Sequence, residues 1–213
     1  MTAAPPAIAM VDYGMGNRRS VAKAFEHVGT PIAQTSDPDE LRAADGLVVP
    51  GVGAFPEAMR RLRALGLDDV VRERGRAGVP VIGLCLGMQL LFDRSVEHEG
   101  ADGLGLLAGQ IVKLDPRGLK LPHIGWNSVH WERPSALCEG LPDPAAFYHV
   151  HTFVAEPEDP SIVLGRGEYG SPFCSFVASG NVFGAQCHPE KSSKHGLALL
   201  RNFVGICATA PVA

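Results

Sequence analysis

No segment of this sequence is long and apolar enough to cross a membrane, and positive charge is not in surplus. The longest apolar stretch, Val79 to Phe92, contains Gln89 and falls short of the roughly 20 residues of a membrane-spanning helix. The formal net charge of −4 argues against a nucleic-acid partner and against a polybasic membrane contact. Residues 1–6 lack the basic region of a secretory signal, and we expect them to form a flexible tail.

Cysteines are few, and their spacing shows no pairs. The five positions are Cys85, Cys138, Cys174, Cys187 and Cys207, an odd number without a C-x-x-C motif. This pattern argues against a disulfide framework and a zinc site, so we expect a protein of the reducing cytoplasm. Free cysteines are mostly buried small apolar side chains, and a reactive one must be identified from its neighbours.

The first half of the chain alternates strand-like and helical patterns. Apolar runs at 7–11, 46–50 and 79–84, and a weaker one at 31–34, are typical of buried strands. Helical spacing relates Val21, Phe25 and Val28, and also Phe55, Met59, Leu62 and Leu65. Alternation of this kind predicts a parallel sheet covered by helices on both faces.

From Gly109 onward the segments are shorter, richer in glycine and proline, and often alternating. The runs 173–178 and 182–187, joined through 179–181, predict an antiparallel hairpin, and Leu197, Leu200 and Val204 predict a last helix. The 213 residues contain no repeat and no linker. We therefore predict a single α/β domain over residues 1–213, with a central mixed, mostly parallel sheet flanked by helices.

Cys85 stands in the segment Gly83-Leu84-Cys85-Leu86-Gly87, between the strand-like run that ends at residue 84 and a run over 87–92 that predicts a helix. Glycines beside a nucleophile are typical of a nucleophile elbow, a sharp strand-to-helix turn with no room for neighbouring side chains. The start of a helix also favours a thiolate. The alternative is a buried cysteine of no chemical importance.

A base and a carboxylate occur near the other end of the chain, in His188-Pro189-Glu190. In an extended segment, residues i and i+2 point to the same side, so Glu190 can reach the imidazole and orient it. A cysteine nucleophile needs such a base and such an orienting group. The alternative is an unrelated surface histidine. It is disfavoured because the cysteine motif and the histidine motif occur in the same chain and each lies on the kind of element that its role requires.

Acyl transfer also requires an oxyanion hole and a site for the substrate. The backbone N–H of Leu86 is one expected donor, and the loop Gly51-Val52-Gly53 after a neighbouring strand is a candidate for the other. The same glycines could form only a tight turn or a phosphate loop. Gln89 lies on the same helical face as Cys85, where its amide could bind substrate or the backbone.

These motifs together resemble the class I (triad) glutamine amidotransferases. Further segments resemble, within that class, the glutaminase subunits of imidazole glycerol phosphate synthase of histidine biosynthesis. They are Asp12-Tyr13-Gly14-Met15-Gly16-Asn17, Pro50-Gly51-Val52-Gly53-Ala54-Phe55, Pro122-His123-Ile124-Gly125-Trp126-Asn127, Tyr148-His149-Val150-His151-Thr152-Phe153 and His188-Pro189-Glu190-Lys191-Ser192-Ser193. The resemblance covers nearly the whole chain after about Ala7.

The resemblance implies a mechanism and assigns roles. Cys85 would attack the side-chain amide of L-glutamine, with His188 and Glu190 completing the triad and Val52, Gly53 and Leu86 forming the oxyanion hole. Glutamine would be held by Gly51, Gln89, His151, Thr152 and Phe153. No metal and no organic cofactor are implied.

The resemblance also implies a partner, a cyclase subunit with a (β/α)8 barrel that uses the ammonia and forms a heterodimer with this chain. The residues that match the family's interface side are Tyr13, Asn17, Trp126, Tyr148 and Lys191. Three positions depart from the family pattern: Cys187 replaces a bulky aromatic, Thr152 a frequent serine and His149 a frequent aromatic. Another glutaminase of the class and a non-catalytic cysteine sensor remain as alternatives.

Overall fold

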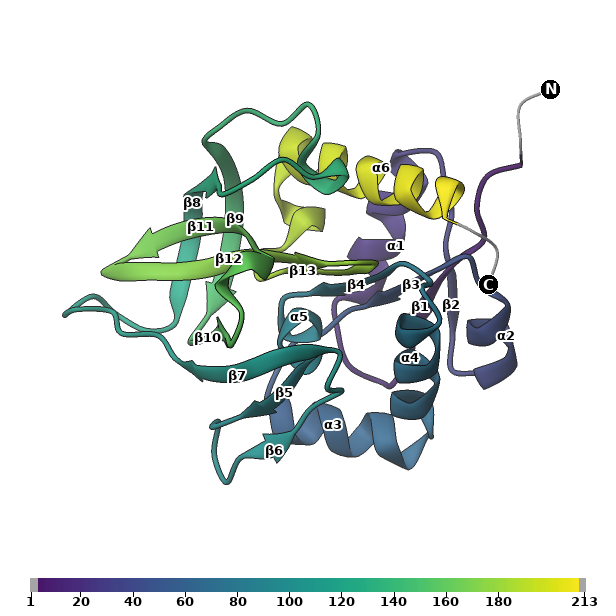
Figure 1. Ribbon diagram of the computed structural model, residues 1–213, viewed down its shortest axis with the longest axis horizontal. Coiled ribbons are helices and arrows are strands. Elements are labelled where there is room, and N and C mark those ends of the chain that lie inside the picture. The colour runs from purple at the N-terminus through teal and green to yellow at the C-terminus, as the bar shows by residue number, and fades with distance from the viewer. Residues whose placement is uncertain (1–3, 211–213) are drawn as a thin grey trace.

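The protein, seen in a computed structural model, is described over residues 4–210. Of the tail predicted at residues 1–6, residues 1–3 lie outside the described residues, and residues 4–6 form coil before the first strand. Figure 1 shows a central sheet with helices on both sides and a group of strands, β8, β9 and β11, at one end of the molecule.

The first part of the chain alternates strands and helices, as its periodicity predicts. The elements are β1 Ile8–Val11, α1 Arg18–His27, β2 Ala33–Thr35, α2 Pro38–Ala43, β3 Gly46–Val49, α3 Phe55–Ala64, α4 Leu67–Arg76, β4 Val81–Leu84, α5 Leu86–Leu90 and β5 Phe92–Ser95. Local signals support some of these boundaries. Asp37, for example, begins α2 because its side chain accepts a hydrogen bond from the Asp39 N–H, and Pro38 fits the first helical turn.

The second part is mostly strands and ends in one long helix. The elements are β6 Ala101–Asp102, β7 Leu107–Lys113, β8 His123–Trp131, β9 Ala145–His151, β10 Phe153–Pro157, β11 Val163–Tyr169, β12 Ser171–Ser179, β13 Val182–Ala185 and α6 Ser193–Thr209, with 3-10 turns at Ala136–Cys138, Pro160–Ile162 and Pro189–Lys191. The predicted antiparallel hairpin is present as β12 and β13.

The sheet follows the order β2-β1-β3-β4-β13-β12-β10-β7-β5-β6. All neighbours from β2 to β13 pair in parallel, whereas β12 pairs antiparallel with both β13 and β10. β11, β8 and β9 continue antiparallel from β12. The prediction of an α/β fold with a mixed sheet and a parallel centre is confirmed.

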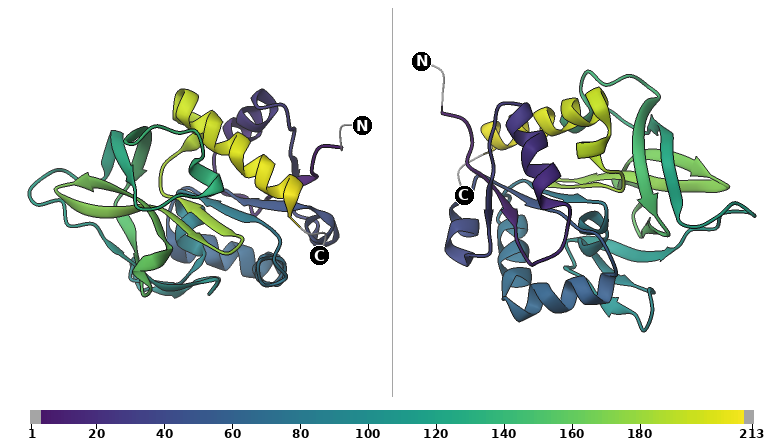
Figure 2. Two further views of the ribbon diagram at one scale, coloured as in Figure 1. Left: turned by 45° about the horizontal axis from the view of Figure 1, so that its top comes forward. Right: turned by 180° about the vertical axis from the view of Figure 1, so that it is seen from behind.

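The parallel centre carries an apolar core on each of its faces. On β3, Leu47 and Val49 belong to the core formed with α3 and α4, while Val48 belongs to the core formed with α1 and α6. Figure 2 shows α1 and α6 on one face of the sheet and α3 and α4 on the other. Because strands buried on both faces need apolar residues throughout, the continuous runs of the sequence fit these strands.

Two details of helix extent differ from the sequence-based expectation. Leu65 does not share the buried face of α3: the helix ends at Ala64, and the Leu65 side chain is 48% exposed. Phe92 does not belong to the helix after Cys85 but begins β5, where it is fully buried. An apolar run alone cannot separate a buried helix from a buried strand, which explains the second error.

The glycines around Cys85 are required by close backbone contacts. A Cβ atom on Gly87 would lie 1.8 Å from the Val49 carbonyl oxygen, and one on Gly83 would lie 2.4 Å from the Gly87 carbonyl oxygen. These contacts are between backbones, so no side chain can move aside. They fix the position at which β4 passes into α5.

We expect Gly87→Ala to lower the free energy of unfolding by at least about 2 kcal/mol, because the added methyl group overlaps main chain. Gly205→Ala in α6 is the matched control, since a Cβ there meets nothing within 4 Å. It should raise stability by about 0.5–1 kcal/mol through the helix preference of alanine. Urea unfolding measures both, and a Gly87→Ala midpoint equal to that of the wild type would contradict the account.

Candidate active site

Cys85 occupies the turn between β4 and α5. Its backbone has φ 55° and ψ −113°, a conformation that residues other than glycine rarely adopt, and its side chain is only slightly exposed. The thiol sulfur lies 3.7 Å from the Val150 carbonyl oxygen and 3.9 Å from Nε2 of Gln186. Strain at this position is the geometry that an elbow nucleophile requires.

His188 and Glu190 follow β13, the strand that pairs in parallel with β4. The distance from His188 Nδ1 to Glu190 Oε1 is 2.9 Å, and both side chains are buried. The segment is not extended as the sequence argument assumed, because Pro189–Lys191 forms a 3-10 turn. This turn brings the carboxylate back to the imidazole.

Two neighbours of His188, the Cys85 side chain and the Glu190 carboxyl group, act on its pKa. Burial alone would lower the pKa of His188, but hydrogen bonds to Cys85 and Glu190 and the charges of both groups raise the pKa to about 10. The ring therefore carries a proton in neutral solution. A thiolate beside a proton donor is the arrangement needed to attack an amide and protonate its leaving nitrogen.

A cavity of about 220 Å³ opens beside the Cys85 thiol. Its lining residues are Val52, Gly53, Cys85, Gln89, Pro122, Val150, His151, Thr152, Phe153 and His188. Most residues that the sequence assigned to catalysis and glutamine binding thus meet at one place. Gly51 lies behind the lining and is buried.

Gln89 has both hydrogens of its amide engaged. Its Nε2 atom donates to the Phe153 carbonyl oxygen at 3.1 Å and to Oε1 of Gln186 at 3.0 Å. Because the nitrogen is fully used, the amide oxygen is the atom that remains for a ligand in the cavity. The sequence left open whether the Gln89 amide binds the backbone or a substrate. The hydrogen bond to the backbone is present, and the amide oxygen is still available to a substrate.

The glycine loop lies against the elbow. A Cβ on Gly51 would lie 2.7 Å from the Gly87 nitrogen and 2.8 Å from the Leu86 Cβ, so only glycine allows this approach. Val52 is 42% exposed, and Gly53 has φ 100°. Leu86, which follows the nucleophile, is buried.

The predicted interface residues have unequal exposure. Trp126 is 55% exposed and makes an edge contact with Tyr148, with ring centroids 6.1 Å apart, and Lys191 is exposed. Asn17 is half-buried, and its amide donates to Glu190 Oε1 at 3.4 Å. Tyr13 is a correction: its side chain is only 2% exposed and its hydroxyl donates to the Pro50 carbonyl oxygen, so the ring belongs to the core.

Sequence reasoning missed two residues that touch this site. Gln186 is fully buried between Gln89 and the Cys85 thiol. Ser192 is fully buried, donates to the His188 carbonyl oxygen at 2.7 Å and accepts from the Tyr148 N–H at 3.0 Å. The available signal was a polar residue at a position where a buried strand or turn was predicted.

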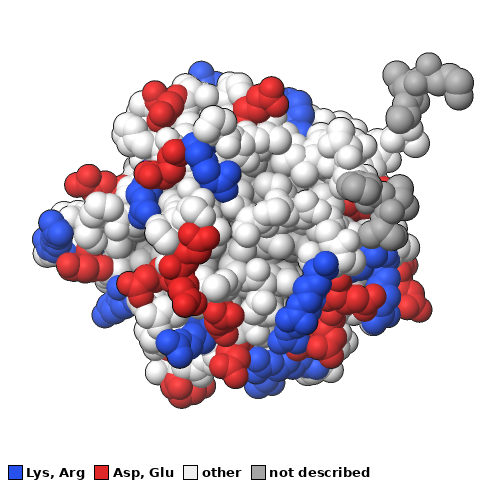
Figure 3. Space-filling view, in the orientation of Figure 1, with Lys and Arg blue, Asp and Glu red and all other residues white. Residues whose placement is uncertain are grey.

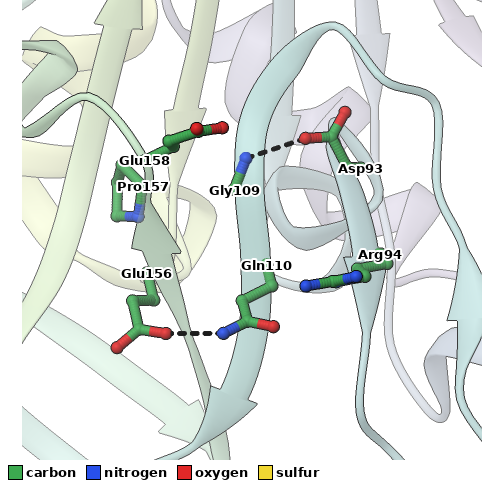
Figure 4. Close-up of a pocket in the computed structure, with 7 residues that line it drawn as sticks. All are labelled: Asp93, Arg94, Gly109, Gln110, Glu156, Pro157 and Glu158. Carbon is green, nitrogen blue, oxygen red and sulfur yellow. Dashed lines mark hydrogen bonds between the residues drawn. The ribbon is translucent and has the colours of Figure 1, made fainter.

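A larger hollow of about 530 Å³ lies elsewhere, along β5, β7 and β10 (Figure 4). Its polar groups largely satisfy one another: Asp93 accepts from the Gly109 N–H, and Glu156 accepts from the Gln110 amide. It contains none of the predicted site residues. The chemistry therefore concentrates at the smaller cavity.

The surface in Figure 3 shows Lys and Arg side chains interspersed with Asp and Glu around a broad area without charged residues. Within residues 4–210, the structure contains no helix with the length and apolarity needed to cross a membrane.

We expect Glu190→Gln to lower the pKa of His188, because the ring loses a hydrogen-bond acceptor and a negative charge. NMR titration of the His188 ring measures this value, and Glu168→Gln, at an exposed site, serves as the control. Because the pKa of His188 is higher in the folded state than in the unfolded state, protonation of this ring stabilises the fold. The contribution is fully present at pH values below the unfolded-state pKa, and it is lost as the pH rises through about 10 in the wild type. The loss should occur at lower pH in Glu190→Gln, and an unchanged His188 titration would contradict the account.

Comparisons with solved structures agree with the fold. A structure described as a glutamine amidotransferase superimposes with a TM-score of 0.75 and 20% identity, covering 95% of this chain and 100% of the other. PurLQS from Thermotoga maritima gives a TM-score of 0.75 at 18% identity, covering 95% and 99%. At these identities the likeness concerns the fold alone.

Sequence comparisons are more specific. Residues 9–207 match the family described as glutamine amidotransferase class-I. The imidazole glycerol phosphate synthase subunit HisH of Moorella thermoacetica is 48% identical over 196 residues, covering 92% of this chain and 93% of the relative. HisH of Bacillus cereus strain G9842 is 49% identical over 199 residues, covering 93% and 94%. The chain therefore belongs to the class I glutamine amidotransferases and, within them, to the HisH subunits of imidazole glycerol phosphate synthase.

Proposed function

We propose that this chain hydrolyses L-glutamine to glutamate and ammonia with Cys85, His188 and Glu190 as its triad, and that it supplies the ammonia to a partner cyclase. The observation that carries this proposal is that Cys85 and His188 line the same 220 Å³ cavity, with Glu190 Oε1 2.9 Å from His188 Nδ1. The lining combines apolar side chains with a few polar groups, Gln89, Thr152 and His188, as ligand sites for small molecules do.

The first step is attack of the Cys85 thiolate on the side-chain amide carbon of glutamine. The negative charge moves to the amide oxygen, where the Leu86 N–H and the loop of Val52 and Gly53 would donate hydrogen bonds. His188 then gives its proton to the departing nitrogen, and ammonia leaves as the carbon–nitrogen bond breaks. Water next hydrolyses the thioester, with His188 as general base, and glutamate is released.

Glu190 serves as the orienting group in this scheme. Its Oε1 atom lies at Nδ1 of His188, which leaves Nε2 to face the nucleophile. The second oxygen, Oε2, is buried and has no hydrogen-bond partner within residues 4–210. The carboxylate thus depends on His188 and on the Asn17 amide, and Asn17 lies on the proposed partner side.

Glutamine recognition follows from the atoms that line the cavity. The Gln89 amide oxygen offers an acceptor for an N–H group of the substrate, because both amide hydrogens are already engaged. The main chain of residues 151–153 and Gly51 completes the pocket in this proposal. A site with fixed polar groups of this kind rejects analogues that leave those groups unpaired.

The proposed partner is the cyclase subunit, a (β/α)8 barrel that forms a heterodimer with this chain in the cytoplasm. Ammonia released into neutral water is protonated and lost, so direct transfer is chemically useful. Three large apolar side chains near the site, Val52, Ile124 and Trp126, are between 42% and 59% exposed, which favours their burial against a partner. The cyclase would use the ammonia to make imidazole glycerol phosphate and an aminoimidazole carboxamide ribotide.

We expect Cys85→Ala to abolish product formation from glutamine, because no thioester can form. The same complex supplied with ammonium salt should still make product at a rate within about twofold of the wild type. Steady-state assays with both nitrogen sources, together with a measurement of complex assembly, distinguish the outcomes. Loss of the ammonia-dependent reaction in an assembled complex would contradict the division of labour between the subunits.

A further inference from the structure

Beside the cavity at Cys85 lies a group of three buried histidines whose side chains the proposed chemistry does not use. His123 is on β8, and His149 and His151 are on β9; their exposed fractions are 2%, 0% and 5%. The strand register places His123 opposite His151 and Gly125 opposite His149. The ring of His123 also stacks on Tyr169, with centroids 4.1 Å apart.

The hydrogen bonds of His151 and His123 fix the position of each proton. His151 Nδ1 lies 3.1 Å from the Phe153 carbonyl oxygen, which can only accept, so this nitrogen carries the hydrogen. The other nitrogen, Nε2, is then an acceptor, and His123 Nδ1 donates to it at 3.0 Å. The remaining nitrogen of His123 is an acceptor in turn and faces the Asn127 amide nitrogen at 3.5 Å.

His149 makes a separate set of hydrogen bonds, although its ring also stacks on His123 with centroids 5.4 Å apart. Its Nδ1 atom donates to the Phe147 carbonyl oxygen at 3.1 Å, and its Nε2 atom accepts from the Ser175 hydroxyl at 2.9 Å. Burial lowers the pKa of all three rings, that of His151 to about 3. The rings are thus neutral hydrogen-bonding groups, and within residues 4–210 no cluster of His, Cys, Asp and Glu is arranged to hold a metal ion.

The hydrogen bonds of His123 and His151 lead to a residue that lines the cavity, whereas those of His149 do not. The series from His123 through His151 ends at the Phe153 carbonyl oxygen, and that oxygen also accepts the amide hydrogen of Gln89 at 3.1 Å. His151, Phe153 and Gln89 line the cavity, whereas His123 does not. His149 ends at Phe147 and Ser175, neither of which lines it.

We propose that His123 is a positioning residue for glutamine binding, acting through His151 and the Phe153 carbonyl to hold the Gln89 amide toward the substrate. The proposal rests on the glutaminase function given above. Without the His123 donor, His151 Nε2 is buried and unpaired, and the ring is free to turn away from Phe153. The Phe153 carbonyl oxygen then keeps only the Gln89 amide as a side-chain donor, so the acceptor that orients this amide is held by one hydrogen bond fewer.

The test compares His123→Phe and His123→Asn in the complex with the partner cyclase. Phenylalanine keeps the stack on Tyr169 but removes the donor, so the KM for glutamine should rise about tenfold while kcat changes less than about twofold. Asparagine places an amide N–H near the position of Nδ1, and it should return the KM to within about threefold of the wild type. Alkylation of Cys85 by iodoacetamide should proceed at the wild-type rate in both variants.

His149→Phe is the matched control. It removes an equally buried ring of the same cluster and leaves Ser175 without its partner, so stability should fall while the KM for glutamine stays at the wild-type value. A KM that rises equally in His149→Phe and His123→Phe would assign His123 a merely structural role and overturn the proposal. An unchanged KM in His123→Phe, or no recovery in His123→Asn, would overturn it as well.

The wild-type assay separates the two proposals. If the wild-type complex does not turn over glutamine, the glutaminase function fails and this inference fails with it. If the wild type is active and the His123 variants do not show the expected KM pattern, the function stands and only the positioning role is wrong.

Discussion

The contact between the end of β3 and the start of α5 is the constraint on which the rest of the site depends. Gly87 lies so close to Val49 that a Cβ would be 1.8 Å from its carbonyl oxygen. This approach allows a strained backbone at Cys85 and brings the Gly51 loop beside it. The nucleophile, the candidate oxyanion loop and the cavity thus meet because two glycines permit two backbones to touch.

The second half of the chain holds the acid–base pair against this elbow. The His188 N–H donates to the Tyr148 carbonyl oxygen at 2.8 Å, and Ser192 joins the Tyr148 N–H to the His188 carbonyl oxygen. The Tyr148 ring contacts the exposed Trp126, so one strand joins the proposed partner surface to the backbone of His188. Asn17 makes a further contact with Glu190, so the proposed partner side reaches both His188 and Glu190 through residues of this chain.

The sequence was sufficient for the parallel centre, the elbow and the carboxylate beside His188, because each has a local signature in apolar runs, flanking glycines or spacing. It was insufficient for Gln186, Ser192 and His123, whose roles depend on strand register and on which backbone groups lie across a sheet. Tyr13 shows the opposite failure: its motif suggested a surface, but its hydroxyl finds the Pro50 carbonyl inside the core. Local pattern identifies reactive groups, while tertiary packing decides which groups position them.

The central claim is that the elbow and triad are in place in this chain but work for a neighbouring active site. The most direct measurement is the rate of glutamine hydrolysis in three samples. They are the purified chain alone, the chain with the cyclase subunit, and the chain with the cyclase and the nucleotide from which the cyclase would make its products. The account predicts slow turnover by the chain alone and a rise of at least about tenfold in the full system, because the exposed Val52 loop completes the oxyanion hole only next to an occupied partner. Full turnover by the isolated chain would contradict it.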